Sequence, residues 1–527
     1  MKKLPLLATV LLCLQIVFAQ KNEASTFATF INGAQLKKHL TIIASPEMEG
    51  RETGTEGQRR AAAYIESQFK LIGLQPAAAL NGYQQMYPLY KDSMSSSTVK
   101  IDNRELIFGT DYFIPVLYNN TRKISASNIV FAGYGISENQ YDDYKNIDVK
   151  GKVVLIFLGE PKANGKYFLS GTDQPSNYTY PGIDTKMMLA ASKGAIAVIA
   201  INPAAASISN KLADQNSKTN VYFPRIEKDK GIGCITLSHE IANQCFSKWK
   251  FDSLVLHAKN GAIFKTGNFA EIKSNYSFDY KKERIQINAS NVLGFIEGTD
   301  KKNEYIFITG HYDHLGIKKG KIYFGADDDG SGTCAVINMA EAFAKAKAAG
   351  KGPRRTIVFM TVSGEEKGLW GSEYYCDHPV FPLENTSVDL NIDMVGRTDT
   401  ERKTDDTLNY VYVIGHNKIS SDLQGINEAA NAKSANLVLD YKFDDPNDPN
   451  RIFYRSDHYN FAKKGVPILF FYDGMLKADY HKPTDTVDKI NFDLYEKRVR
   501  MIFYTAWEIA NRNDMLKRDI PLIDIDE

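Results

Sequence analysis

Hydrophobic and polar positions along this chain follow two repeating patterns, which together predict an α/β protein. Short apolar runs, typical of buried strands, alternate with longer stretches whose apolar residues recur at helical spacing. In the second half the expected strands are 292–297, 305–309, 356–362, 390–394, 410–414, 437–441 and 466–472. The expected helices there are 333–349, 421–432, 457–464 and 491–510. This alternation predicts a mixed, largely parallel sheet flanked by helices.

The first half of the chain predicts a second, smaller α/β unit. Two helices are expected near the start, at 36–44 and 58–72. From about residue 127 the pattern becomes more compact, with strands and one helix expected at 129–132, 153–158, 186–192 and 195–201. We therefore expect an inserted α/β domain over 121–262, between two parts of the main domain at 20–120 and 263–527. The insert has no cluster of His, Cys or acidic residues, so a structural or substrate-gating role is the hypothesis for it.

The first 19 residues have the pattern of a secretory signal peptide. Lys2 and Lys3 precede the apolar run 4–18, and small residues at 17–19 suit the cleavage site, so we expect the mature chain to begin at Gln20. The alternative is a membrane anchor, but the run is short for a span. No later stretch is long and apolar enough to cross a bilayer. We expect an exported protein, periplasmic or extracellular, without stable membrane insertion.

Composition narrows the range of partners. The chain has 527 residues, more than one ordinary core, with 64 Lys plus Arg and 63 Asp plus Glu. This balance gives no electrostatic reason to expect nucleic acid or an anionic membrane as a partner. Export would permit a disulfide between Cys234 and Cys245, but the sequence alone does not show which cysteines are paired. The favoured interpretation is that the cysteines are small buried residues.

Polar, metal-ligating side chains follow five of the expected strands or turns. They are His311, the run Asp327 to Asp329, the pair Glu365 and Glu366, Asp393, and His481. In an α/β sheet such positions meet at the carboxyl ends of the strands. One acidic residue at such a place is commonly a helix cap, but capping does not explain all five.

Imidazole and carboxylate ligands together suit Zn²⁺, and two ions can share a carboxylate and a water molecule. Hydrolysis also needs one carboxylate that stays free of metal and takes a proton from the water. The adjacent residues Glu365 and Glu366 meet both needs, because consecutive side chains point in different directions.

The chain resembles the M28 family of co-catalytic zinc peptidases. The matching segments are Gly310–Asp313, Gly325–Gly332, Ser363–Ser372, Asn391–Met394, Ser456–Phe461 and Tyr480–His481, and an early segment, 47–57, is also similar. The resemblance covers most of residues 285–512. Residues 127–262 resemble a protease-associated (PA) domain, an insert common in this family.

The resemblance implies a role for each matching residue. His311 and Asp393 would bind one zinc, Glu366 and His481 the other, and Asp328 would bridge both. Glu365 would be the general base, Asp313 would hold the imidazole or the base, and Tyr480 would donate a hydrogen bond to the oxyanion.

Some residues keep an alternative interpretation. His314 could replace His311, and His458 competes with His481, although a structural or substrate-lining role suits His458 better. Asp327 and Asp329 are expected to shape the turn and cap the helix. Arg397 and the acidic run Asp444, Asp445 and Asp448 could line the substrate pocket, with a solvated loop the favoured interpretation for the run.

The resemblance implies a di-zinc exopeptidase acting on peptides, in the first place an aminopeptidase. A glutamate-carboxypeptidase-like enzyme is the nearest alternative. A glutaminyl cyclase would use one zinc and lack the insert, and a receptor-like relative would hold no metal. The sequence does not indicate the oligomeric state.

Overall fold

The computed structural model describes residues 23–179, 182–224, 231–247, 251–264, 271–403 and 406–522. Two compact units make up the chain: Met1–Tyr87 with Asn288–Glu527, and Pro88–Ile287. The expected signal peptide, 1–19, lies outside the described residues. In the part of the chain that the structure describes, no helix has the length and apolar character needed to cross a membrane.

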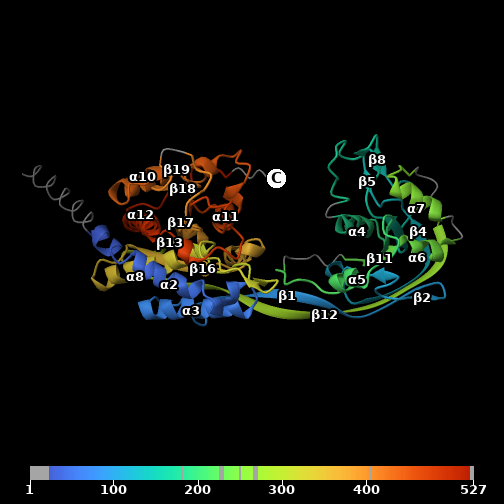
Figure 1. The fold of residues 1–527 in the computed structure, drawn as a ribbon, viewed down its shortest axis with the longest axis horizontal. Helices are drawn as coiled ribbons and strands as arrows, with labels where there is room; N and C mark the ends of the chain where they lie inside the picture. Colours follow the sequence, from blue (N-terminus) through green and yellow to red (C-terminus); the bar gives the residue numbers. More distant parts are fainter. Residues whose placement is uncertain are drawn as a thin grey trace, which may run out of the picture. The chain divides into compact units, whose positions relative to one another are not determined.

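The first unit is built on a mixed sheet with the strand order β19-β18-β20-β17-β13-β16-β12 (Figure 1). The strands are β12 (Glu271–Ile296), β13 (Lys301–His311), β16 (Arg355–Val362), β17 (Thr386–Ile392), β18 (Tyr410–Ile414), β19 (Val438–Asp440) and β20 (Ile468–Tyr472), with a small ladder of β14 (Ile317–Lys318) and β15 (Lys321–Ile322). β13 pairs in parallel with β16 and β17, and β17 with β20, whereas β12 and β18 pair antiparallel with β16 and β20. The predicted mixed, largely parallel sheet is confirmed.

Helices cover both faces of this sheet. They are α2 (Gly33–Ile43), α3 (Glu56–Ile72), α8 (Gly330–Ala348), α9 (Trp370–Asp377), α10 (Leu423–Lys433), α11 (His458–Lys463) and α12 (Phe492–Asn511). Ile308 of β13 lies in one core cluster with Phe343 of α8 and Ile502 of α12. Its neighbour Phe307 lies in another, with Phe461 of α11. Alternate residues of a strand point to opposite faces, so a strand covered on both sides is apolar throughout, as the sequence pattern predicted.

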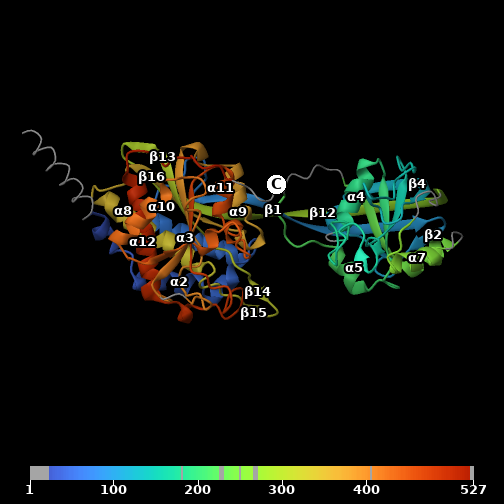
Figure 2. The same cartoon turned by 90° about the horizontal axis from the view of Figure 1, so that it is seen from above.

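The second unit is a smaller α/β arrangement. Its central strands are parallel in the order β4-β7-β10-β11, with helices around them (Figure 2). The elements are β1 (Gln84–Ile101), β2 (Arg104–Leu106), β3 (Tyr112–Phe113), β4 (Arg122–Phe131), β5 (Ser137–Glu138), β6 (Tyr141–Asp142), β7 (Val153–Phe157), β8 (Lys162–Ala163), β9 (Lys166–Tyr167), α4 (Ile183–Ser192), β10 (Ala197–Asn202), α5 (Asn210–Asn216), β11 (Gly233–Ser238), α6 (His239–Cys245) and α7 (Phe251–Lys259).

The second unit is wider than the insert expected at 121–262. It extends to Pro88 and Ile287 because β1 pairs with β2, and because the first part of β12 pairs with β4 over Glu271–Tyr280. These long strands alternate polar and apolar residues, which predicts strands but not the unit to which they belong.

Cys234 and Cys245 do not form a disulfide, and all four cysteines of the described residues have free thiols. Cys234 lies buried in β11, where burial raises the pKa of its thiol to about 12. The interpretation of this cysteine as a small buried residue is confirmed.

Candidate metal centre

The carboxyl ends of neighbouring strands bring the predicted ligands together at one edge of the first unit's sheet. His311 is the last residue of β13, and Asp393 comes directly after β17. Glu365 and Glu366 follow β16 and open a short 3-10 helix, η4 (Glu365–Lys367). Since β16, β13 and β17 are adjacent and parallel, their carboxyl ends lie side by side.

The Nε2 atom of His311 lies close to three carboxylates. This buried atom is 3.3 Å from Asp328 Oδ1, 3.6 Å from Asp393 Oδ1 and 3.8 Å from Glu365 Oε2. Burial lowers the pKa of His311, but the facing Glu365 and Asp393 outweigh burial, so this pKa lies well above its ordinary value. Ligand atoms of His311, Glu365 and Asp393 are close enough together to hold one ion.

A second group forms around the other oxygen of Asp328. Asp328 Oδ2 is 3.2 Å from His481 Nε2, and the same nitrogen is 3.0 Å from Glu366 Oε2. His314 Nδ1 lies 2.7 Å from Glu366 Oε1 and 3.8 Å from Asp328 Oδ2. Asp328 thus offers one oxygen to each group, as a ligand shared by two ions would.

His314 joins this second group and does not take the place of His311. The sequence allowed His314 to be the metal ligand in place of His311, and the structure contradicts this alternative. The chain leaves β13 after His311, and the backbone N–H of His314 donates to the carbonyl of Arg51 at 3.3 Å. The two rings therefore reach different sides of Asp328. A His-x-Asp-His spacing at a strand end is the one feature of the sequence that could have indicated this.

The residues present fit a divalent metal. In the described part of the chain, Asp328 Oδ2, Glu366 Oε1 and both ring nitrogens of His314 are buried and make no hydrogen bond of good geometry, although Glu366 Oε1 and His314 Nδ1 lie 2.7 Å apart. Each such atom costs about 1–3 kcal/mol when it is left without a partner. A cation among them would remove that cost, and imidazole nitrogen with carboxylate oxygen is a donor set that suits zinc.

Asp313 connects His311 to Glu365. Its carbonyl oxygen lies 3.1 Å from His311 Nδ1, and its Oδ1 accepts a hydrogen bond from the Glu365 backbone N–H at 3.3 Å. Its Oδ2 in turn accepts a bond of 2.6 Å from Thr53 Oγ1. This geometry suits the positioning role predicted for Asp313. Thr53 was not predicted, although it lies within the early segment 47–57 that resembles the family.

Asp327 and Asp329, the outer members of the run Asp327 to Asp329, accept hydrogen bonds from backbone N–H groups. Asp329 is the N-cap of α8, with its Oδ1 accepting from Gly332 N at 2.7 Å and its Oδ2 from His311 N at 3.1 Å. Its predicted capping role is confirmed. Asp327 Oδ1 accepts a hydrogen bond of 2.8 Å from the backbone N–H of Gly396, in the loop that follows β17. The peptide bond between Asp328 and Asp329 is cis.

Two supporting residues were not predicted. Ser456 Oγ donates a hydrogen bond of 2.6 Å to Asp393 Oδ2, which orients that carboxylate. The carboxylate of Asp485 accepts the backbone N–H groups of Asp327 and Asp328 at 3.0 and 3.1 Å. Ser456 opens the segment Ser456–Phe461 that resembles the family, whereas Asp485 lies in a loop where the sequence gives no signal.

Glu365 and Tyr480 both line the cavity beside these groups. Burial raises the pKa of Glu365 well above its ordinary value; His311 opposes this shift, and Asp393 adds to it. The Tyr480 ring stacks on the His481 ring with centroids 3.8 Å apart, and burial raises the pKa of Tyr480. Tyr480 is therefore a neutral hydroxyl beside a predicted ligand.

His458 takes no part in either group. It is fully buried, its Nε2 lies 2.8 Å from the Phe453 carbonyl oxygen, and burial lowers its pKa to about 3. A structural role, one of the two interpretations left open, fits this environment, and the alternative that His458 replaces His481 does not.

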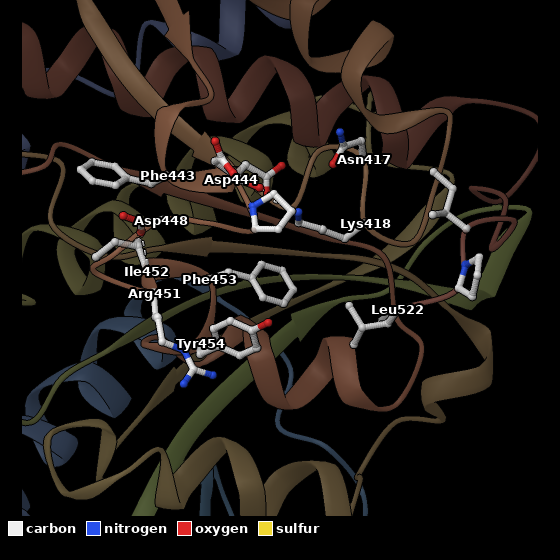
Figure 3. A pocket seen from close by; sticks show the side chains of 14 residues that line it. Asn417, Lys418, Phe443, Asp444, Asp448, Arg451, Ile452, Phe453, Tyr454 and Leu522 are labelled. Carbon is white, nitrogen blue, oxygen red and sulfur yellow. Dashed lines mark hydrogen bonds and ion pairs between the residues drawn. The ribbon is translucent and has the colours of Figure 1, made fainter. Parts of the chain in front are cut away.

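Arg397 and the acidic run lie apart from the two groups. Arg397 pairs with Asp479 at 2.7 Å and is not among the residues lining the cavity at the metal centre. Asp444 is buried, 2.5 Å from His416 Nδ1, so a solvated loop is the wrong interpretation for this residue. It lines a second cavity of about 240 Å³ (Figure 3). Ile452 lines both cavities, which are therefore neighbours.

Two family models match the chain. The model described as Peptidase family M28 matches residues 291–506, which include every predicted ligand, and the model described as PA domain matches residues 115–233.

Three curated relatives are similar to parts of the chain. A probable zinc metalloprotease of Pyrenophora teres f. teres (strain 0-1) is 26% identical over 268 residues, covering 42% of this chain and 52% of that protein. A glutamate carboxypeptidase 2 homolog of Caenorhabditis briggsae is 24% identical over 448 residues, covering 75% and 55%. Aminopeptidase YwaD of Bacillus subtilis (strain 168) is 22% identical over 236 residues, covering 42% and 45%. The chain spans about half the length of these relatives.

Proposed function

Because this chain carries a peptidase domain of family M28 together with a PA domain, we propose that it is a zinc-dependent exopeptidase. The proposed reaction is hydrolysis of a peptide bond, with release of the N-terminal residue. The observation that carries this proposal is the position of Asp328, whose two oxygens lie 3.3 Å from His311 and 3.2 Å from His481. That arrangement supports two zinc ions for each chain.

In this proposal His311 and Asp393 would hold one zinc, Glu366 and His481 would hold the other, and Asp328 would serve both. Bound zinc supplies Lewis acidity, which polarises a carbonyl group and makes a nearby water molecule more acidic.

Glu365 acts as the general base. It lines the cavity, and the bond from its backbone N–H to Asp313 holds it in place. Its carboxylate takes a proton from the attacking water, and the carboxylic acid then gives that proton to the amine that leaves. The group thus holds the proton between the two steps.

Tyr480 stabilises the negative charge on the oxygen of the tetrahedral intermediate. Its hydroxyl lies in the same cavity, and Arg455 Nη2 donates a hydrogen bond to its oxygen at 3.0 Å. The hydroxyl hydrogen stays available to an oxyanion, and a donor already in place costs no reorganisation during the reaction.

An aminopeptidase is favoured over a carboxypeptidase by the carboxylates at the centre. A free substrate amine would meet Glu365 and Asp393, which are the negative groups it needs. The similarity to an aminopeptidase of Bacillus subtilis adds support, while that to a glutamate carboxypeptidase 2 homolog makes the carboxypeptidase the second candidate.

Zinc content and hydrolysis test the proposal together. We expect two zinc ions per purified chain by mass spectrometry, whereas one would favour a cyclase and none a receptor-like protein. A panel of aminoacyl-nitroanilides and C-terminally acidic peptides separates aminopeptidase from carboxypeptidase activity. Glu365→Gln should keep its zinc and lose hydrolysis by at least about 100-fold. Retained turnover in that variant would remove Glu365 as the base.

Export is part of the proposal, supported by the signal-like pattern of residues 1–19. N-terminal sequencing of the protein from its native host should find Gln20 as the first residue. A chain recovered with Met1 in place, in the cytoplasmic fraction, would contradict export.

A further inference from the structure

One arginine, Arg455, lines the cavity at the metal centre and has no carboxylate partner among the described residues. Other cations near this region are paired. Arg397 lies 2.7 Å from Asp479, and Lys367 lies 2.6 Å from Glu52. The side chain of Arg455 is exposed, so a group arriving from solvent can reach it.

The position of Arg455 is tied to the metal centre from two sides. Its guanidinium Nη2 donates to Tyr480 Oη at 3.0 Å, and the guanidinium carbon lies 5.9 Å from the centroid of the Tyr480 ring. The next residue, Ser456, donates to the predicted ligand Asp393 at 2.6 Å. Arg455 is therefore one residue away from a side chain that contacts a predicted ligand, and it touches the predicted oxyanion donor.

The other walls of the cavity are largely apolar. Away from the predicted ligands, the base and Tyr480, the lining residues besides Arg455 are Met394, Ile452, Phe470, Tyr472 and Leu476. A guanidinium has five N–H donors, and a carboxylate matches two of them at once. One hydrogen bond to Tyr480 leaves N–H donors of the guanidinium free for such a group.

From this arrangement we infer that Arg455 binds a carboxylate of the substrate, so that the site selects peptides with a negative group close to the scissile bond. The inference rests on the proposed peptidase function and gives it a substrate class. The carboxylate has two sources: an acidic side chain next to the scissile bond, or the terminal α-carboxylate of a dipeptide.

Binding to a zinc-loaded Glu365→Gln variant tests the inference without turnover. Calorimetry compares Leu-Gly with Leu-Gly-amide for the terminal carboxylate, and Glu-Gly-amide with Gln-Gly-amide for the side chain. The charged member of one pair should bind at least about tenfold more tightly, as expected for a charge-assisted bidentate contact. The pair that shows the preference identifies the source of the carboxylate.

Variants at Arg455 then assign the preference to this side chain. Arg455→Gln, added to Glu365→Gln, should remove the preference, and Arg455→Lys should keep part of it, because lysine retains the charge and loses the fork. Lys463→Gln is the matched control, since it removes one exposed cation of α11 away from the cavity. Equal affinities within both pairs, or a preference that survives Arg455→Gln, would overturn the inference.

Hydrolysis of Leu-p-nitroanilide by the unmodified enzyme separates this inference from the proposed function. Hydrolysis without any carboxylate preference in binding rejects only the role of Arg455. A carboxylate preference in binding, without hydrolysis of any peptide, rejects only the proposed activity.

Discussion

Thr53 Oγ1 donates a hydrogen bond of 2.6 Å to Asp313 Oδ2, which joins a loop near the start of the chain to the candidate metal centre. The two residues are 260 positions apart, and both are buried. Because Asp313 also contacts His311 and Glu365, this bond lets the N-terminal segment orient the centre.

Replacing Thr53 by Val should lower kcat on Leu-p-nitroanilide about tenfold, with zinc content unchanged, because Asp313 loses the donor that orients it. Steady-state kinetics and metal analysis measure this. Thr55→Val is the matched control, since Thr55 Oγ1 donates a local hydrogen bond, to the Glu52 carbonyl oxygen at 2.6 Å. An unchanged kcat in Thr53→Val would show that the contact does not serve catalysis.

Asparagine at Asp328 and at Asp393 should have different effects on zinc content. Asp328 offers an oxygen to each group, whereas Asp393 belongs to one. We expect Asp393→Asn to keep about one zinc per chain and Asp328→Asn to keep less than one, after dialysis against a weak chelator. Equal retention of zinc by the two variants would contradict a bridging role for Asp328.

His314→Ala should weaken the zinc site that contains Glu366 by about 10- to 100-fold, as loss of a ligand or of a group that orients one does. The reason is the 2.7 Å contact between His314 Nδ1 and Glu366 Oε1. Competition with a fluorescent chelator measures the affinity. His458→Ala removes a buried histidine outside both groups and serves as the control. If both variants bind zinc like the wild type, His314 is a structural residue.

His39 should make the first unit sensitive to acid. Burial, with a smaller effect of Lys38, lowers the pKa of His39 from 6.5 to about 4. The folded-state pKa lies below the unfolded one, so the stability that neutral His39 contributes is complete above pH 6.5 and declines as the pH falls towards 4. At pH 5 the loss is roughly 2 kcal/mol in the free energy of unfolding.

Denaturant unfolding at pH 7.5 and pH 5 tests this, with His39→Gln as the variant. Between pH 7.5 and pH 5, the free energy of unfolding should fall by roughly 2 kcal/mol less in His39→Gln than in the wild type, because glutamine does not take up a proton. His257→Gln changes an exposed histidine and should behave like the wild type. Identical pH dependence in His39→Gln and the wild type would contradict the prediction.

Gly332→Ala should destabilise the first unit by at least about 2 kcal/mol, since an added Cβ would overlap the Ile392 carbonyl oxygen and the Asp329 carboxylate. Gly425→Ala is the control, because nothing lies within 4 Å of a Cβ at that helical position. That change should raise stability by about 0.5–1 kcal/mol. Thermal and denaturant unfolding measure both, and equal stability of Gly332→Ala and the wild type would show that the turn can adapt.

The sequence predicted local features well where one physical rule governs them. Buried parallel strands such as β16 must be apolar on both faces, so their runs stand out. Asp329 caps α8 as expected, because an acidic residue before a helix satisfies free N–H groups. The boundaries of the second unit were less predictable, since long strands with alternating polarity can belong to either unit.

Contacts between distant segments could not be read from the chain. Ser456, Asp485 and Thr53 are ordinary loop residues whose importance comes from what they touch. Likewise, pairing with Asp479 accounts for Arg397, whereas Arg455 has no such partner among the described residues. The spacing of residues along the chain does not show which charged side chains contact one another in the fold.

By itself, the sequence determined the succession of strands and helices and the presence of imidazole and carboxylate groups at strand ends. Hydrophobic periodicity along the chain indicates the strands and helices. A parallel sheet then brings the carboxyl ends of its strands, with their polar side chains, to one edge. Only the tertiary structure decided which oxygen of Asp328 faces which histidine, that His314 joins Glu366, and that Arg455 lies in the cavity. Those relationships depend on side-chain directions across loops, where no periodic rule applies and packing alone sets the geometry.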